Sequence, residues 1–167
     1  MSAVSELIDL YAQGPATLEY AVYGLSDEQL RARPGPGSWS VAELVAHLAD
    51  ADAVGADRIK RTIAEPGSSL LAFDETAWNE RLRMQDSSIA DALALFRANR
   101  VWMAGILRRC DEADFKLRGT HSERGPVTLA DQVAGMVGHL DHHLKFLYAK
   151  RSNLRTAIQP RYSRPSV

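Results

Sequence analysis

The chain is short of cysteine, of long apolar runs and of excess charge. Of its 167 residues only Cys110 is a cysteine, which excludes an intramolecular disulfide and a thiolate-rich zinc site and fits a reducing cytoplasm. No apolar run approaches the roughly 20 residues that span a bilayer, and the first residues show no secretory signal pattern. A net charge of −1 argues against nucleic acid as a partner. We therefore expect a cytoplasmic protein with no membrane and no nucleic-acid partner, in which histidines and carboxylates hold any metal.

The composition is that of an ordinary globular protein. Hydrophobic residues make up 46% of the chain and charged residues 25%. The length suits one domain with a sizeable core and is too small for two. We expect one bundle domain over residues 1–153, followed by a peripheral C-terminal tail over 154–167 that carries exposed arginines.

Four segments carry the 3.6-residue periodicity of amphipathic helices. Capping boxes open two of them, formed by Ser40 with Glu43 and by Thr128 with Asp131. No strand pattern is visible. The predicted long helices cover residues 4–23, 41–64, 89–110 and 129–151, and a short helix is predicted over 74–83.

The connection between the second and third long helices is unusually long. It holds roughly two dozen residues, far more than a simple turn needs. That length is enough to recross a helix of about 35 Å at 1.5 Å per residue. We therefore predict an all-α four-helix bundle with a long crossover, in which the second and third helices run parallel.

Three of the five histidines lie within five positions of the fourth helix. At about 100° per residue, His139 and His143 fall on the same side of the apolar face, whereas His142 falls about 160° from its centre and points to solvent. An i, i+4 pair of imidazoles can converge on one ion. Because Leu140 stands where H-E-x-x-H has its glutamate, the pair does not indicate a zincin-type protease.

A third ligand is available on the second helix. His47 holds the same edge-of-core position there that His139 holds on its own helix. Three histidines on two helices would leave coordination positions open, as in catalytic rather than structural metal sites. The alternative interpretation is that these histidines are hydrogen-bonded packing residues at the rim of the core.

Four motifs follow one another along nearly the whole chain. They are GSWSVAELVAHLADAD at 37–52, FDETAWN at 73–79, HSERGPVTLADQV at 121–133 and HLDHHLKFL at 139–147. In this order they resemble the DinB/YfiT-like superfamily. The resemblance implies an up-down-down-up bundle, commonly a homodimer, and a divalent metal, often nickel or zinc. Carried over residue by residue, the ligands that it implies are His47, His139 and His143.

The function that the resemblance implies is a metal-dependent reaction on a small-molecule substrate. Members of the family include transferases of low-molecular-weight thiols such as bacillithiol, isomerases that use mycothiol, and proteins described as hydrolases. We expect a thiol S-transferase in which the metal, nickel or zinc with manganese and iron as further candidates, lowers the pKa of the thiol. The alternatives are a hydrolase that activates water, a non-catalytic metal- or ligand-binding bundle, and a helical interaction module.

Several further polar residues have no assigned catalytic role. Asp50 and Asp141 either orient an imidazole from behind or lie on a solvated face. His121 either lines the mouth of the site or lies in a solvent-exposed loop. Cys110 is interpreted as structural or incidental, and the alternative is a redox role.

One further pair is predicted in the core. Asp52 and Arg100 fall on the inner faces of the second and third helices, and parallel helices would bring them level. We predict a buried structural ion pair; the alternative is that Arg100 grips an anionic substrate.

Overall fold

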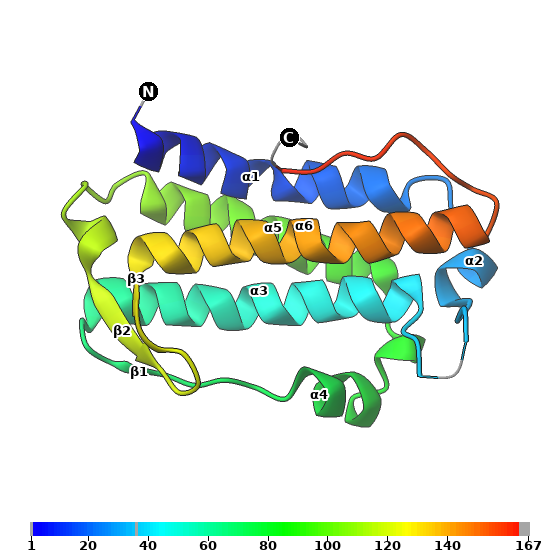
Figure 1. Ribbon diagram of the computed structural model, residues 1–167, viewed down its shortest axis with the longest axis horizontal. Coiled ribbons are helices and arrows are strands. Elements are labelled where there is room, and N and C mark those ends of the chain that lie inside the picture. Colours follow the sequence, from blue (N-terminus) through cyan, green and yellow to red (C-terminus); the bar gives the residue numbers. More distant parts are fainter. Residues whose placement is uncertain (1, 36, 164–167) are drawn as a thin grey trace.

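The computed structural model describes residues 2–35 and 37–163 and folds them mainly into helices (Figure 1). The four long helices lie close to the predicted ranges. They are α1 (Ala3–Val22), α3 (Val41–Ala64), α5 (Ile89–Leu107) and α6 (Leu129–Asn153). The shorter elements are α2 (Asp27–Arg31), α4 (Glu75–Arg81) and the 3-10 turns η1 (Met84–Asp86) and η2 (Asp114–Lys116). Within the described ranges no helix is both long and apolar enough to cross a membrane.

The predicted capping boxes set the starts of the two helices that carry the histidines. The Ser40 hydroxyl accepts from the Glu43 backbone N–H, and the Glu43 carboxylate accepts from the Ser40 N–H at 2.8 Å. Thr128 and Asp131 make the same reciprocal pair at the start of α6. Each pair satisfies two backbone donors that the first helical turn leaves without a partner.

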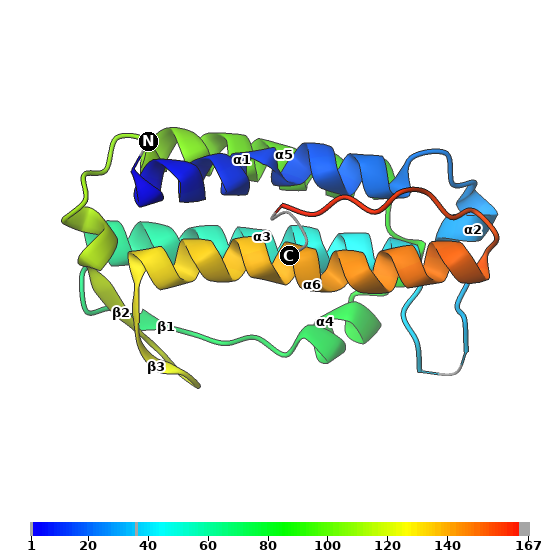
Figure 2. The ribbon, with the colours of Figure 1, turned by 45° about the horizontal axis from the view of Figure 1, so that its top comes forward.

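The helix directions confirm the up-down-down-up bundle. Figures 1 and 2 show α1 and α6 running one way, and α3 and α5 running the other way. The chain recrosses the length of the bundle between α3 and α5, and α4 lies on this crossover beside α3. The prediction from the length of the connection is therefore confirmed: the consecutive long helices α3 and α5 run parallel.

A small sheet corrects the expectation that the chain has no strands. Strands β1 (Ser69–Leu70), β2 (Arg118–His121) and β3 (Gly125–Thr128) lie in the order β1-β2-β3. β1 is parallel to β2, with Leu70 opposite His121, and β2 is antiparallel to β3. Strands this short cannot show a two-residue alternation, and the β1–β2 pairing joins segments that are distant in sequence. Periodicity could not reveal them.

Residues 154–163 lie back along the helices. Ile158 and Tyr162 pack against the core cluster. The Arg161 guanidinium lies 3.8 Å from the centre of the Tyr20 ring, and the Arg161 N–H donates to the Tyr148 hydroxyl. This part of the chain is therefore tied to both α1 and α6.

A buried polar layer divides the hydrophobic core into two clusters. On one side lie residues such as Leu48, Phe96 and Leu144, and on the other Ile59, Met103 and Val133. Between them, Arg100 Nε donates to Asp52 Oδ1 at 2.8 Å, and both side chains are almost wholly buried. Four further residues contact this pair and complete the layer: Tyr11, Gly14, Asn99 and Met136.

The predicted Asp52–Arg100 pair is thus confirmed, and its partners explain how the charges are tolerated. Asn99 donates to the second Asp52 oxygen at 2.6 Å, and the Arg100 Nη atoms donate to the carbonyls of Tyr11 and Met136. Burial raises the pKa of Asp52, whereas Arg100 and Asn99 act to lower it. Because Arg100 is held inside the core, its alternative role of gripping a substrate does not hold.

Two residues of α1 make room for the guanidinium. Pro15 lies inside the helix and has no N–H, so the Tyr11 carbonyl lacks its usual helical donor and accepts from Arg100 instead. A Cβ atom at Gly14 would lie 2.3 Å from Arg100 Nη1. The Gly14-Pro15 pair therefore provides both the space and the acceptor for Arg100.

We expect Asp52→Ala to lower the free energy of unfolding by about 3–5 kcal/mol, because it leaves the Arg100 charge buried without its partner. Urea unfolding followed by circular dichroism measures this. Asp57→Ala removes an exposed carboxylate of the same helix, which pairs with Arg61, and should change stability by less than about 1 kcal/mol. Equal losses in the two variants would contradict the structural role of the buried pair.

Candidate metal centre

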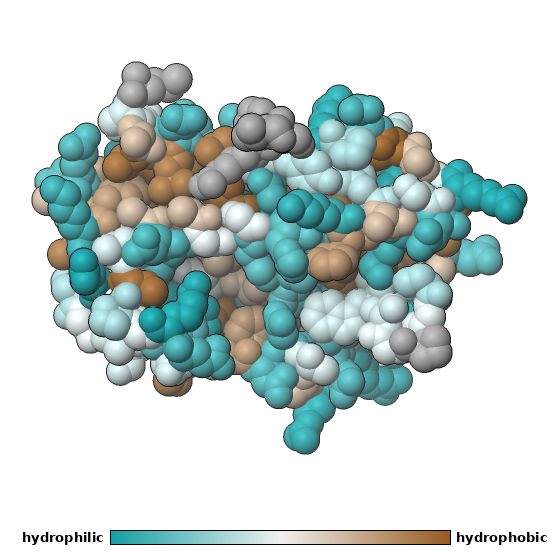
Figure 3. All heavy atoms as spheres, in the orientation of Figure 1, coloured by the Kyte–Doolittle hydropathy of each residue, from teal (hydrophilic) through white to brown (hydrophobic). Residues whose placement is uncertain are grey.

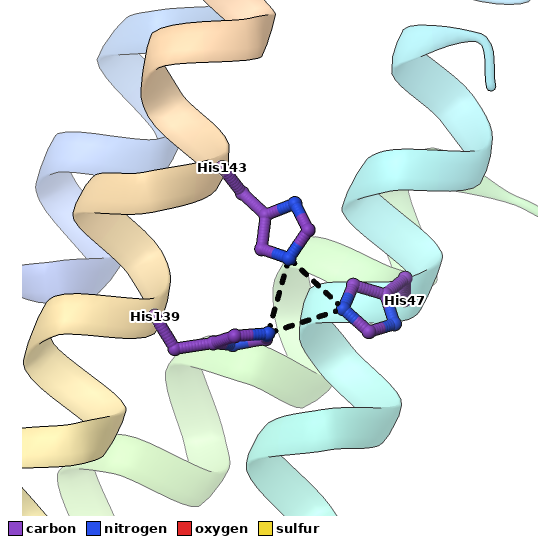
Figure 4. Close-up of side chains that lie close together, drawn as sticks. All are labelled: His47, His139 and His143. Atoms are coloured by element: carbon purple, nitrogen blue, oxygen red, sulfur yellow. Dashed lines mark hydrogen bonds between the residues drawn. The ribbon is translucent and has the colours of Figure 1, made fainter. Parts of the chain in front are cut away.

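The structure brings together the three histidines selected from the sequence. His47 points from α3 toward His139 and His143 on α6, and the Nε2 atoms of all three rings face one another (Figure 4). The Nε2–Nε2 distances are 3.2 Å from His47 to each of the others and 3.0 Å between His139 and His143. His47 is buried, and the other two are half-buried.

This nitrogen triangle has the size that one divalent ion requires. A point equidistant from the three Nε2 atoms lies about 1.8 Å from each, close to the Zn–N bond length of about 2.0–2.1 Å. Imidazole donors suit zinc, nickel, copper and iron. Three ligands leave coordination positions free for a substrate or water.

The electrostatics of the cluster keep the imidazoles in the form that binds metals. Burial, with the neighbouring His47, lowers the pKa of His139 to about 4. Burial, with His139 and His47, lowers the pKa of His143 to about 3. Burial also lowers the pKa of His47, although Glu75 opposes the shift. The rings are therefore neutral at pH 7 and offer lone pairs.

The outer ring nitrogen of His143 lacks the hydrogen bond that usually orients a metal-bound imidazole. The Nδ1 atom of His143 is buried and has no hydrogen-bond partner among the described residues, whereas metal-bound histidines usually donate from this position. Among the described residues, Asp50 makes no hydrogen bond to the triad. Asp141 accepts from the Ser163 N–H at 2.7 Å.

The crossover adds a carboxylate that the sequence analysis did not select. Glu75 Oε2 lies 3.4 Å from His47 Nε2, with the Glu75 side chain about half exposed. Asp74 caps α4 by accepting from the Ala77 N–H, and buried Asn79 donates to the Glu43 carbonyl of α3. These contacts hold the first turn of α4 beside the triad. The only signal for Glu75 was its place in the FDETAWN motif.

Packing around the triad is aromatic. The His47 ring centre lies 5.1 Å from that of Trp39 and 6.5 Å from that of Phe73. Phe73 directly precedes the α4 cap. The same short segment of the crossover therefore supplies both a ring against His47 and the carboxylate.

The remaining candidates lie outside the triad. His142 is exposed and lines the rim of the adjoining cavity. His121 ends β2 rather than lying in a solvent-exposed loop; it is buried, and its Nδ1 accepts from the Glu123 N–H. Cys110 is half-buried beyond the end of α5, where burial raises the pKa of its thiol.

A cavity of about 380 Å³ opens beside the triad. His139 and Glu75 line one end of it, and Gln132, Arg58 and Arg124 belong to its wall. Its lining also includes small residues of α3 and α6, among them Gly55, Gly135 and Gly138. The cavity thus gives a small molecule access to the candidate metal centre at His139.

The fold and the site define a four-helix bundle with a three-histidine centre that can hold a divalent metal. The sequence profile of the DinB superfamily matches residues 10–147. The chain therefore belongs to the DinB superfamily.

Known proteins agree with this assignment. "Putative metal-dependent hydrolase YfiT" of Bacillus subtilis (strain 168) is 30% identical over 82% of this chain and 78% of its own length. A "Putative metal-dependent hydrolase" of Geobacillus thermodenitrificans (strain NG80-2) is 34% identical over 68% of this chain and 64% of its own length. The solved structure of YfiT from Bacillus subtilis is described as a probable metal-dependent hydrolase with an unusual four-helix bundle topology. It superposes with a TM-score of 0.86 at 25% identity, over 93% of this chain and 90% of that one.

We predict that the untagged protein binds about one divalent ion per chain, because the triangle has room for one. Elemental analysis after incubation with zinc or nickel and desalting measures this. His47→Ala and His143→Ala should each lose the ion, whereas the matched variant His142→Ala should retain it. Retention of the ion by both triad variants would show that these histidines are packing residues.

Proposed function

We propose that the protein is a metal-dependent hydrolase of a small-molecule substrate, with His47, His139 and His143 as ligands of zinc or nickel. The observation that carries the proposal is the convergence of three neutral imidazole nitrogens, 3.0–3.2 Å apart, beside an open cavity. The printed names of the relatives support hydrolysis. A divalent ion in such a site supplies Lewis acidity, which polarises a carbonyl group and makes water a competent nucleophile near neutral pH.

Glu75 is the residue of this chain best placed to move a proton. Its carboxylate lies at the triad and is half exposed, and a carboxylate in reach of a bound water can accept a proton from it. In our proposal it takes a proton from the attacking water and returns it to the leaving group as the substrate bond breaks. The products are then a carboxylic acid and an alcohol or amine.

Thiol transfer and a purely structural ion are weaker alternatives. The relatives are named for hydrolysis, and no contact in the described residues favours the thiol transfer that we expected from the family resemblance. A purely structural ion would be enclosed by its ligands, whereas here a cavity of about 380 Å³ reaches the triad. Turnover that requires an added thiol and an electrophile would favour the transferase.

We predict that the zinc-loaded protein hydrolyses an activated ester such as 4-nitrophenyl acetate. Glu75→Gln should lower kcat by about a hundredfold or more, because the amide cannot accept the proton. The release of 4-nitrophenolate, followed at 400 nm (roughly its absorbance maximum), measures the rate.

Glu80→Gln is the matched control. Glu80 is an exposed carboxylate on the same short helix, and its loss should leave kcat unchanged. Both variants should retain zinc. Full activity of zinc-loaded Glu75→Gln would remove Glu75 from the mechanism, and full activity of His47→Ala would remove the metal from it.

The homodimer implied by the family resemblance remains a prediction. Val101 and Trp102 of α5 are 62% and 67% exposed. On the face in Figure 3, hydrophobic residues also gather over the N-terminal half of α1, which packs on α5. A second copy of the chain would bury such surfaces.

We therefore expect a dimer mass by light scattering, and a shift toward the monomer in Trp102→Ser. The matched control is Tyr23→Ser, which removes another exposed aromatic residue, at the far end of α1. A wild-type protein that stays monomeric at every concentration tested would exclude the dimer.

A further inference from the structure

The cavity beside the triad has two chemically different ends. At one end lie the metal-binding histidine His139 and the carboxylate of Glu75. The lining also includes Gln132 of α6, Arg58 of α3, which follows His47 by eleven residues, and Arg124 of the β2–β3 turn near Arg58. Because α3 and α6 run in opposite directions (Figure 1), Gln132 and Arg58 both lie toward the other end of the cavity. Gln132 precedes His139 by seven residues of α6, so the two ends are about 10 Å apart at 1.5 Å per residue.

The two arginines bring unpaired positive charge to the far end. Among residues 2–35 and 37–163, no carboxylate forms an ion pair with Arg58 or Arg124. Two nitrogens of Arg58, Nε and Nη2, donate to the Leu71 carbonyl, and Nη1 has no acceptor within the described part of the chain. Burial and the nearby Arg124 lower the pKa of Arg58, against smaller opposing effects of Glu123 and Asp57. The two guanidinium groups are therefore close enough to repel each other.

Gln132 adds an unsatisfied polar group to the same wall. Its side chain is 7% exposed, and its Nε2 donates to the Thr62 hydroxyl at 2.8 Å. Its Oε1 is buried with no hydrogen-bond partner among the described residues. A buried amide with one end unpaired costs free energy unless a ligand or water satisfies it. This oxygen is an acceptor, so a water or an N–H or O–H group can satisfy it, whereas a carboxylate at this end would be bound by the two arginines alone.

We propose that this arginine end binds a carboxylate of the substrate about 10 Å from the bond that is hydrolysed at the triad. The substrate class is then an elongated monoester or monoamide of a dicarboxylic acid, or a molecule of similar shape. The assignment rests on the proposed function, because the triad defines the reacting end. A carboxylate suits the site, since guanidinium groups bind it in a planar, bidentate manner.

The local charge balance at the arginine end favours a ligand group with a single negative charge. Arg58 and Arg124 carry two positive charges, and Glu123 beside them carries one negative charge. Asp57, which also lies near Arg58, is held by Arg61. The net positive charge that remains matches one carboxylate better than a doubly charged phosphate group.

A dicarboxylate and a monocarboxylate of equal chain length test the proposal. Suberate has carboxylates at both ends, about as far apart as the two ends of the cavity, whereas octanoate has only one. In isothermal titration calorimetry with the zinc-loaded protein, both can place a carboxylate at the triad. We expect suberate to bind about tenfold more tightly or better, because only suberate also reaches the arginines.

Arginine variants locate the effect. Arg124→Gln and Arg58→Gln should each weaken suberate binding about tenfold and leave octanoate binding unchanged. The matched control, Arg118→Gln, removes an exposed positive charge from the same hairpin but not from the cavity. Circular dichroism and zinc content show that each variant is folded and loaded. Arg124 lies in an exposed turn, so its variant keeps the test valid if Arg58→Gln unfolds.

The outcomes separate this proposal from the hydrolase proposal. Binding of suberate by the metal-free protein that is lost in Arg124→Gln supports the arginine site, even if no ester is hydrolysed. Equal binding of suberate and octanoate by the wild type overturns it, and so does an Arg118→Gln loss as large as that of Arg124→Gln. Hydrolysis of 4-nitrophenyl acetate without any suberate preference would leave the hydrolase proposal standing and remove this one.

Discussion

The placement of one guanidinium group organises the bundle. Arg100 of α5 bonds to α3 through Asp52, to α1 through the Tyr11 carbonyl and to α6 through the Met136 carbonyl. A charge in a hydrophobic core is tolerated only where its donors find acceptors, so these contacts fix how far each helix can slide along its neighbours. Asp52 follows His47 by five residues, and Met136 precedes His139 by three. The register that Arg100 enforces is therefore also the register of the histidine triangle.

The candidate site combines rigid and variable parts of the fold. Two capped long helices hold the three imidazoles, which gives the nitrogens a fixed geometry. The crossover contributes Glu75, and the hairpin contributes Arg124. Groups that meet a substrate commonly lie on connections supported by a rigid scaffold. In our proposal the bundle would hold the metal, and the connections would select what reaches it.

The parallel pair α3 and α5 makes this division feasible. Two consecutive helices of a simple up-and-down bundle would be joined at one end by a short loop. Here the connection must travel the length of α3 (Figure 1). It passes the triad on the way, with Glu75 Oε2 3.4 Å from His47 Nε2. Asn79 fastens it to the Glu43 carbonyl, which belongs to the capping residue of α3. The topology therefore brings a carboxylate to the metal centre without interrupting a long helix.

The sequence by itself determined the features that depend on local chemistry: the long helices, their caps, the inward side of His47, His139 and His143, and the inner faces of Asp52 and Arg100. Each follows from the helical period or from the contact of a side chain with its own backbone turn. Only the tertiary structure decided that Pro15 frees a carbonyl for Arg100, that β1 pairs with β2, and that Glu75, Arg58 and Arg124 line one cavity. Those contacts join segments far apart in the chain, and no periodicity records a distance between such segments.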